Sequence, residues 1–202
     1  MNRIGQALIV FLIFIAFNAN SEDGYKNFIP ILDQAKMKLE KPLNMKETPV
    51  IKNDELYYQY AVKDSIMGFE IRYLVYPLQE LVNKYNSPHP DTGMTHLDPN
   101  MIHTNLLVMY SLKIQGKEMA VDAFPEIKEI NHATADLEFN ADWAAQVNIT
   151  PCDEFAQKYK YATILELHKD NIADAFVIFL YNDKDKYDDM MKPVFHTLRF
   201  IK

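Results

Sequence analysis

The sequence predicts an α+β protein, a three-layer α/β/α sandwich around a mainly antiparallel sheet. Runs rich in aromatic and β-branched residues occur in pairs, 56–62 with 69–76 and 161–168 with 175–181, as is typical of hairpins. The run 175–180 is apolar without alternation, which indicates a strand covered on both faces. Because segments with apolar residues at helical spacing flank these runs, we expect helices on both sides of the sheet.

The first third of the predicted domain consists of a helix, a connector and a hairpin. Apolar residues at helical spacing predict an amphipathic helix over 25–39; they are Phe28, Ile31, Leu32, Ala35 and Leu39. Two prolines and the lack of periodicity make 41–54 a connector. In the hairpin, alternation places two sets of side chains on one buried face; they are Tyr58, Tyr60 and Val62, and Phe69, Ile71, Tyr73 and Val75.

The middle of the chain predicts two helices. Pro77 ends the second strand, and a short helix is expected over 78–85. Asp98 followed by Pro99 is typical of an N-cap with proline at the first helical position. A helix of about 16 residues whose apolar side packs on the sheet is predicted by Ile102, Leu106, Met109 and Lys113 at helical spacing, with Gly116 beyond.

The last third predicts further strands and a closing helix. Runs 135–139 and 143–150 are expected to pair across a turn at 140–142, and a second hairpin joins 161–168 to 175–181 through 169–174. Apolar residues at helical spacing from Tyr187 to Leu198 predict a helix that Pro193 kinks or starts. Residues 198–201 are expected to be extended.

Residues 1–21 predict a secretory signal. Arg3 precedes a short apolar run, and small residues follow that favour cleavage before Glu22, with cleavage after Ala19 as the alternative. The run is too short to span a bilayer. We therefore expect a signal peptide over 1–21, a single α+β domain over 22–202, a periplasmic or secreted location, and no stable membrane insertion.

The composition excludes some partners and cofactors. The formal net charge is −7, with acidic residues interleaved among lysines, so a phosphate-binding basic patch and a nucleic-acid partner are not expected. Phosphate-loop, dinucleotide, nucleophile-elbow and H-E-x-x-H motifs are absent from the sequence. We expect no cofactor. With Cys152 as the only cysteine, packing must stabilise the core without an intramolecular disulfide.

A histidine- and aspartate-rich segment is the most suggestive chemical pattern. Imidazoles and carboxylates close together on a loop can ligate zinc or a similar ion; the weak candidates are His89, Asp91, His96, Asp98 and His103. The H-x-x-x-H spacing of a helical site is absent, and capping a helix is a sufficient role for Asp98. We assign no metal ligand and no catalytic residue.

Other residues have a structural and a functional interpretation. Trp143 either packs in the core or presents its ring to a ligand. Glu70 and Arg72, on the other face of their strand, either pair with each other or hold a charged ligand. Cys152 and His168 as a nucleophile and base match no known local signature. Asn148 starts a glycosylation pattern that Pro151 disfavours.

Four short motifs resemble an uncharacterised family of secreted bacterial proteins, which in turn resembles the PsbP-like α/β/α sandwich; they are Phe69-Glu70-Ile71-Arg72-Tyr73, Phe139-Asn140-Ala141-Asp142-Trp143, Leu167-His168-Lys169 and Phe195-His196-Thr197-Leu198-Arg199-Phe200. The wider fold includes the extrinsic PsbP subunit of the oxygen-evolving complex and a Ran-binding nuclear import factor, which are adaptor or assembly proteins. The resemblance implies the sandwich fold and transfers no residue-level function.

Two functions follow as hypotheses. The first is a non-catalytic binding or adaptor module that contacts an unknown protein or small ligand, in the envelope or outside the cell, through sheet edges or loops. The alternative is a metal-dependent hydrolase that uses the segment from His89 to His103.

Overall fold

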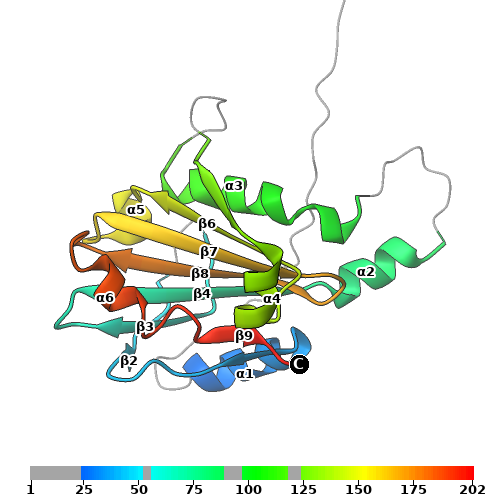
Figure 1. Ribbon diagram of the computed structural model, residues 1–202, viewed down its shortest axis with the longest axis horizontal. Helices are drawn as coiled ribbons and strands as arrows, with labels where there is room; N and C mark the ends of the chain where they lie inside the picture. Colours follow the sequence, from blue (N-terminus) through cyan, green and yellow to red (C-terminus); the bar gives the residue numbers. More distant parts are fainter. Residues whose placement is uncertain (1–23, 52–55, 89–96, 118–123) are drawn as a thin grey trace, which may run out of the picture.

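A seven-stranded antiparallel sheet forms the centre of the computed structural model (Figure 1). Its strand order is β2-β3-β4-β8-β7-β6-β5, and β1 and β9 form a separate antiparallel pair. The structure describes residues 24–51, 56–88, 97–117 and 124–202. Helices lie on both faces of the sheet, so the predicted α+β sandwich is confirmed.

The elements are numbered in their order along the chain. The strands are β1 Met37–Leu39, β2 Lys46–Glu47, β3 Tyr60–Asp64, β4 Phe69–Pro77, β5 Ile127–Ile130, β6 Trp143–Ile149, β7 Tyr161–Lys169, β8 Ala173–Tyr181 and β9 Leu198–Phe200. The helices are α1 Gly24–Gln34, α2 Gln79–Asn86, the 3-10 helix η1 Pro99–Met101, α3 His103–Ile114, α4 His132–Phe139, α5 Asp153–Ala156 and α6 Tyr187–Met191.

The hairpin of β7 and β8 is the centre of the sheet, as predicted. All nine residues of β8 are buried, because β4 and β7 flank the strand and side chains cover both of its faces. The two strands are each longer at the turn than expected, so the loop shortens and Asp174 lies within β8. This extension brings polar side chains into the ladder.

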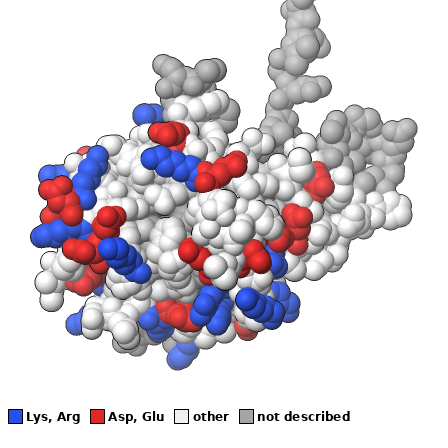
Figure 2. Space-filling view, in the orientation of Figure 1, with Lys and Arg blue, Asp and Glu red and all other residues white. Residues whose placement is uncertain are grey.

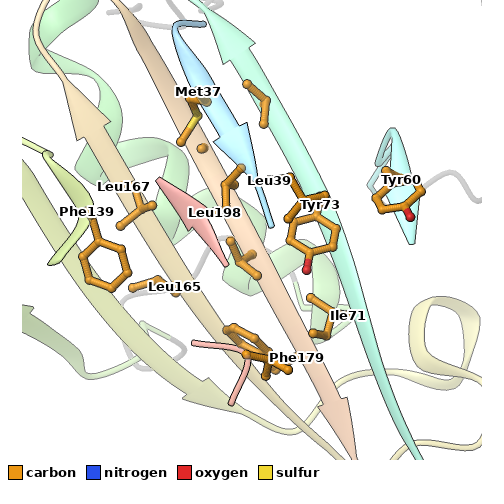
Figure 3. Packing of buried hydrophobic residues seen from close by; sticks show 14 of the residues in the cluster. Met37, Leu39, Tyr60, Ile71, Tyr73, Phe139, Leu165, Leu167, Phe179 and Leu198 are labelled. Atoms are coloured by element: carbon orange, nitrogen blue, oxygen red, sulfur yellow. The ribbon is translucent and has the colours of Figure 1, made fainter. Parts of the chain in front are cut away.

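One face of the sheet packs against α1, α4, α6 and the β1–β9 pair. Figure 3 shows Met37, Leu39 and Leu198 from that pair lying over the side chains of the large sheet, among them Ile71 and Phe179. Phe28 of α1 is fully buried and stacks on Tyr60 with ring centroids 5.5 Å apart. The short strand pair therefore serves as a lid on the apolar core of this face.

The opposite face packs against α3 and α5. The buried side chains of α3 that meet the sheet include Leu107, Tyr110 and Ile114. The predicted apolar side of this helix was therefore wrong by one residue, since Leu106 and Met109 are only partly buried. Asp98 is an N-cap, accepting a hydrogen bond from the backbone N–H of Asn100, but it caps the 3-10 helix η1. The predicted single helix of about 16 residues was wrong, because α3 begins separately at His103.

The prediction of one helix over 25–39 was wrong. α1 ends at Gln34, and Lys36 adopts a left-handed conformation with φ of 51°, which ends the helix. The next three residues are strand β1, in which Met37 pairs with Phe200 and Leu39 with Leu198. Leu39 lies four residues after Ala35, so its spacing fits a helix by coincidence although the residue belongs to a strand.

The first strand of the predicted hairpin begins later than expected. β3 starts at Tyr60 rather than at 56, and Tyr58 lies in the cluster under α3 instead of sharing a face with Tyr60. The side chain of Gln59 forms two hydrogen bonds to the backbone of Val75, in place of a regular ladder at this point. This irregularity turns Tyr58 to the other face.

The strand predicted over 135–139 is helix α4. Asn131 caps it by accepting a hydrogen bond from the N–H of Thr134, and Asn140 ends it in a left-handed conformation. The partner of β6 is instead β5, where Ile127 lies opposite Val147. Capping by the two asparagines therefore favours a helix in a segment whose apolar content is also compatible with a strand.

The end of the chain follows the prediction in part. α6 spans only 187–191 and stops before Pro193, while the predicted extended segment is β9. Within the described ranges, the structure contains no helix of the length and apolarity that crossing a membrane requires.

Candidate functional site

Four adjacent strands contribute one residue each to a polar row at the end of the sheet. Tyr76 of β4 lies opposite Asp174 of β8, which lies opposite His168 of β7, which lies opposite Trp143 of β6. Directly opposed residues of antiparallel strands share a face, here the one under α3. We call these four residues the polar row.

His168 is held at both ring nitrogens. Its Nδ1 lies 2.5 Å from Oδ1 of Asp174, and its Nε2 lies 2.9 Å from Oδ1 of Asp170. Burial lowers the pKa of His168, but the hydrogen bonds and charges of these two carboxylates outweigh burial and raise the pKa above its ordinary value. The two aspartates therefore favour the charged form of His168.

A second histidine covers the row from α3. The ring of His103 stacks on that of His168, with centroids 4.1 Å apart, and its centroid lies 4.7 Å from that of Trp143. Nδ1 of His103 lies 3.0 Å from the carbonyl oxygen of Asn100. Burial, and then the neighbouring His168, lower the pKa of His103, so its surroundings favour the neutral imidazole.

Glu166 lies beneath the row, two residues before His168 on the same face of β7. Its side chain is fully buried, and neither carboxylate oxygen has a hydrogen-bond partner among the described residues. Burial, and then the negative charge of Asp174, raise the pKa of Glu166 well above its ordinary value. An unsatisfied buried carboxyl with a raised pKa is a candidate for function.

Aromatic side chains from α3, β4 and β8 pack near Glu166 and Asp174. The hydroxyl of Tyr110 on α3 donates a hydrogen bond of 2.9 Å to the hydroxyl of Tyr76, and its ring meets that of Phe176 edge-on at 4.9 Å. Burial is the main cause that raises the pKa of both tyrosines. They stay neutral and supply hydroxyl groups near the two acids.

Glu70 and Arg72 pair with each other, which was the structural interpretation of these residues. Arg72 Nε donates to Glu70 Oε1 at 2.7 Å, and Nη1 donates to the carbonyl oxygen of Phe155 at 2.6 Å. The guanidinium also lies over the rings of Tyr58 and Phe155. This buried pair joins α5 to the sheet and stands apart from the polar row along β4.

The structure describes two of the five candidate metal ligands. His89, Asp91 and His96 lie outside the described residues. Of the other two candidates, Asp98 caps η1 and His103 stacks between His168 and Trp143. In the part of the chain that the structure describes, no three His, Cys, Asp or Glu side chains are arranged to hold a metal ion.

Three further residues had alternative interpretations. Trp143 is half-buried and packs on His103, so packing and ligand contact are both open to it. Cys152 precedes α5, where its backbone N–H donates to Ile114, whereas the nitrogens of His168 face aspartates. Asn148 accepts a hydrogen bond of 2.8 Å from the Thr163 hydroxyl within the sheet.

Sequence reasoning named His103, Trp143 and His168 separately and missed the residues that join them. Asp174 was assigned to a loop, and Glu166 was treated as one residue of a strand. A signal was present, because Glu166 and His168 alternate within an otherwise apolar run. Two ionisable residues on one face of a covered strand cost free energy to bury, so each is expected to have a hydrogen-bonding partner or a function.

The two histidines should titrate in opposite directions from an ordinary imidazole. We expect His168 to titrate above pH 6.5 and His103 below it, because carboxylates face the first and a cation faces the second. Imidazole resonances followed by NMR against pH measure both, with His103→Ala and His168→Gln spectra as assignments. Two ordinary titrations near the same pH would contradict this geometry.

Comparisons with known proteins leave the family open. No protein-family model and no curated protein matches the chain. Among solved structures, the chain is similar to cyanobacterial PsbP (CyanoP) from Synechocystis, with a TM-score of 0.42 and 10% sequence identity over 83% of this chain and 88% of that chain. A similarity of this degree assigns no role to any residue here.

Proposed function

We propose that this protein is a non-catalytic binding module, located in the periplasm or outside the cell, which contacts a small ligand at the polar row. The observation that carries the proposal is the row itself, a rigid set of polar and aromatic groups across four strands with the unsatisfied Glu166 beneath it. The signal pattern of residues 1–21 supports the location.

The hydrogen bonds of the row support binding over catalysis. Both nitrogens of His168 face carboxylates, and Nδ1 of His103 faces a backbone carbonyl. A general base needs a nitrogen within reach of a hydroxyl, thiol or water that it activates. These hydrogen bonds of the two imidazoles lead instead to groups that fix the orientation of the rings, which is the preorganisation that a binding site requires.

The edges of the sheet offer less to a partner than its polar end does. The two outer strands are short, and each carries a lysine followed by a glutamate: Lys46 and Glu47 in β2, Lys128 and Glu129 in β5. Charged residues on short edge strands oppose pairing with another strand. Of the two surfaces expected from the sequence, edges and loops, the loop end at the polar row is therefore preferred.

The experiment is a fragment screen of the mature protein by NMR. We expect fragments to shift the resonances of His103, Trp143 and Asp170 together, and His103→Ala to abolish those shifts. His196→Ala is the matched control, because this histidine pairs with Glu138 on the exposed surface. Fragments that gather at another surface, or shifts that persist in His103→Ala, would refute the proposed site.

A further inference from the structure

We infer that the polar row and Glu166 bind the primary ammonium group of a small organic cation. This inference rests on the proposed function and adds the chemical class of the ligand. Three features of the site carry it: a set of buried acceptor oxygens without donors, an aromatic rim, and an excess of carboxylates at the entrance.

The acceptor oxygens match an ammonium group in number. Oε1 and Oε2 of Glu166 and Oδ2 of Asp174 are buried and have no donor among the described residues. Glu166 lies diagonal to Asp174 in the ladder of β7 and β8, two residues from the directly opposed His168. A primary ammonium group carries three N–H donors and no acceptor. It would satisfy oxygens whose burial without partners destabilises the folded protein.

Aromatic rings surround these oxygens. Tyr110 and Phe176 lie on the inner side, and His103 and Trp143 form the rim. The faces of such rings attract cations, most strongly that of tryptophan. A ligand with an ammonium head and a short apolar body would place its head at Glu166 and Asp174 and its body against the rim.

The surface at this end of the sheet is acidic. Asp170 and Asp142 flank the turn between β7 and β8, and Asp98 caps η1 near it. Lys169 is the neighbouring cation; its Nζ lies 2.7 Å from the carbonyl oxygen of Asn140 and 3.7 Å from Oδ1 of Asp142. In Figure 2 the surface between α4 and α2 carries acidic groups, while most Lys and Arg groups of this face lie elsewhere. This charge attracts a cation and repels a carboxylate.

His103 belongs to the aromatic rim of the site. It is half-buried and covers His168 from the first turn of α3. Its contacts are one backbone carbonyl and two ring faces. The ring of His103 is therefore one of the groups that the apolar body of the ligand would contact.

The test uses n-butylammonium as the probe, with 1-butanol and butyrate as neutral and anionic controls at constant ionic strength. The chain contains one tryptophan, Trp143, so intrinsic tryptophan fluorescence reports on the rim directly. We expect a saturable change with n-butylammonium alone, at millimolar affinity for so small a ligand. Glu166→Gln should weaken binding at least about tenfold, whereas the exposed Glu138→Gln should leave it unchanged.

The outcomes separate the ligand class from the proposed function. An equal saturable response to 1-butanol or butyrate would overturn the ammonium assignment and leave a binding site at the row. An unchanged affinity in Glu166→Gln would overturn the role of the buried acids. No response to any probe would also overturn the assignment, and the fragment screen then decides the proposed function on its own.

Discussion

Replacing Glu166 by glutamine is expected to stabilise the protein at neutral pH. The folded protein disfavours the ionised form of this carboxyl, because burial and then the charge of Asp174 raise its pKa well above the ordinary value, whereas the unfolded chain ionises it freely. Each pH unit above the ordinary carboxyl pKa then favours unfolding by about 1.4 kcal/mol until the folded pKa is reached. Glutamine has a similar shape and does not ionise, so we expect a gain of about 1–3 kcal/mol at pH 7.

The stability difference between wild type and Glu166→Gln is expected to depend on pH. Since the folded pKa is raised, the wild-type protein loses stability as pH rises from about 4.5 toward the folded pKa, and Glu166→Gln does not lose this contribution. Urea unfolding at several pH values measures the difference, which should vanish at acidic pH. Glu80→Gln, on the exposed side of α2, is the control. A variant that is less stable than wild type at pH 7 would show that the carboxyl has a partner it needs.

Replacing His168 by leucine is expected to destabilise the protein by about 3–5 kcal/mol, because it leaves the carboxylate of Asp174 buried without its cationic partner. The raised pKa of His168 means that its contribution is complete below about pH 6.5 and is lost as pH rises through the folded pKa. The loss in His168→Leu should therefore be largest near pH 6. Urea unfolding across this range measures it.

An exposed pair of the same kind provides the matched control. His196 Nε2 lies 2.8 Å from Oε2 of Glu138, and both side chains are more than a third exposed. His196→Leu should cost no more than about 1 kcal/mol, as is usual for surface ion pairs. The double variant His168→Leu with Asp174→Leu should regain most of the stability. Equal losses at the buried and exposed pairs would contradict the burial argument.

The fold was predictable where patterns extend over many residues. The apolar run of β8 and the alternation in β4 led to the centre of the sheet, and those strands are present with the predicted faces. Segments 25–39 and 135–139 were assigned wrongly because the deciding features are single residues. A left-handed Lys36 and an asparagine cap at 131 each change the element without changing the apolar pattern.

The site was predictable only as separate residues. Trp143, His168 and Asp174 are neighbours because the ladders of three strands place them at one level, and a register cannot be read from one strand at a time. A shift of one residue in β8 would move Asp174 to the other face. Tertiary pairing therefore assembles the site, and spacing along the chain carries little information about it.

The pairing of β1 with β9 makes the completion of folding depend on the two ends of the described chain. Met37 pairs with Phe200, so the layer that holds α1 can close only after nearly the whole described chain has emerged. Contacts between segments so distant in sequence form late and slowly. A chain whose last tertiary contacts depend on its final strand stays incompletely folded until that strand is available.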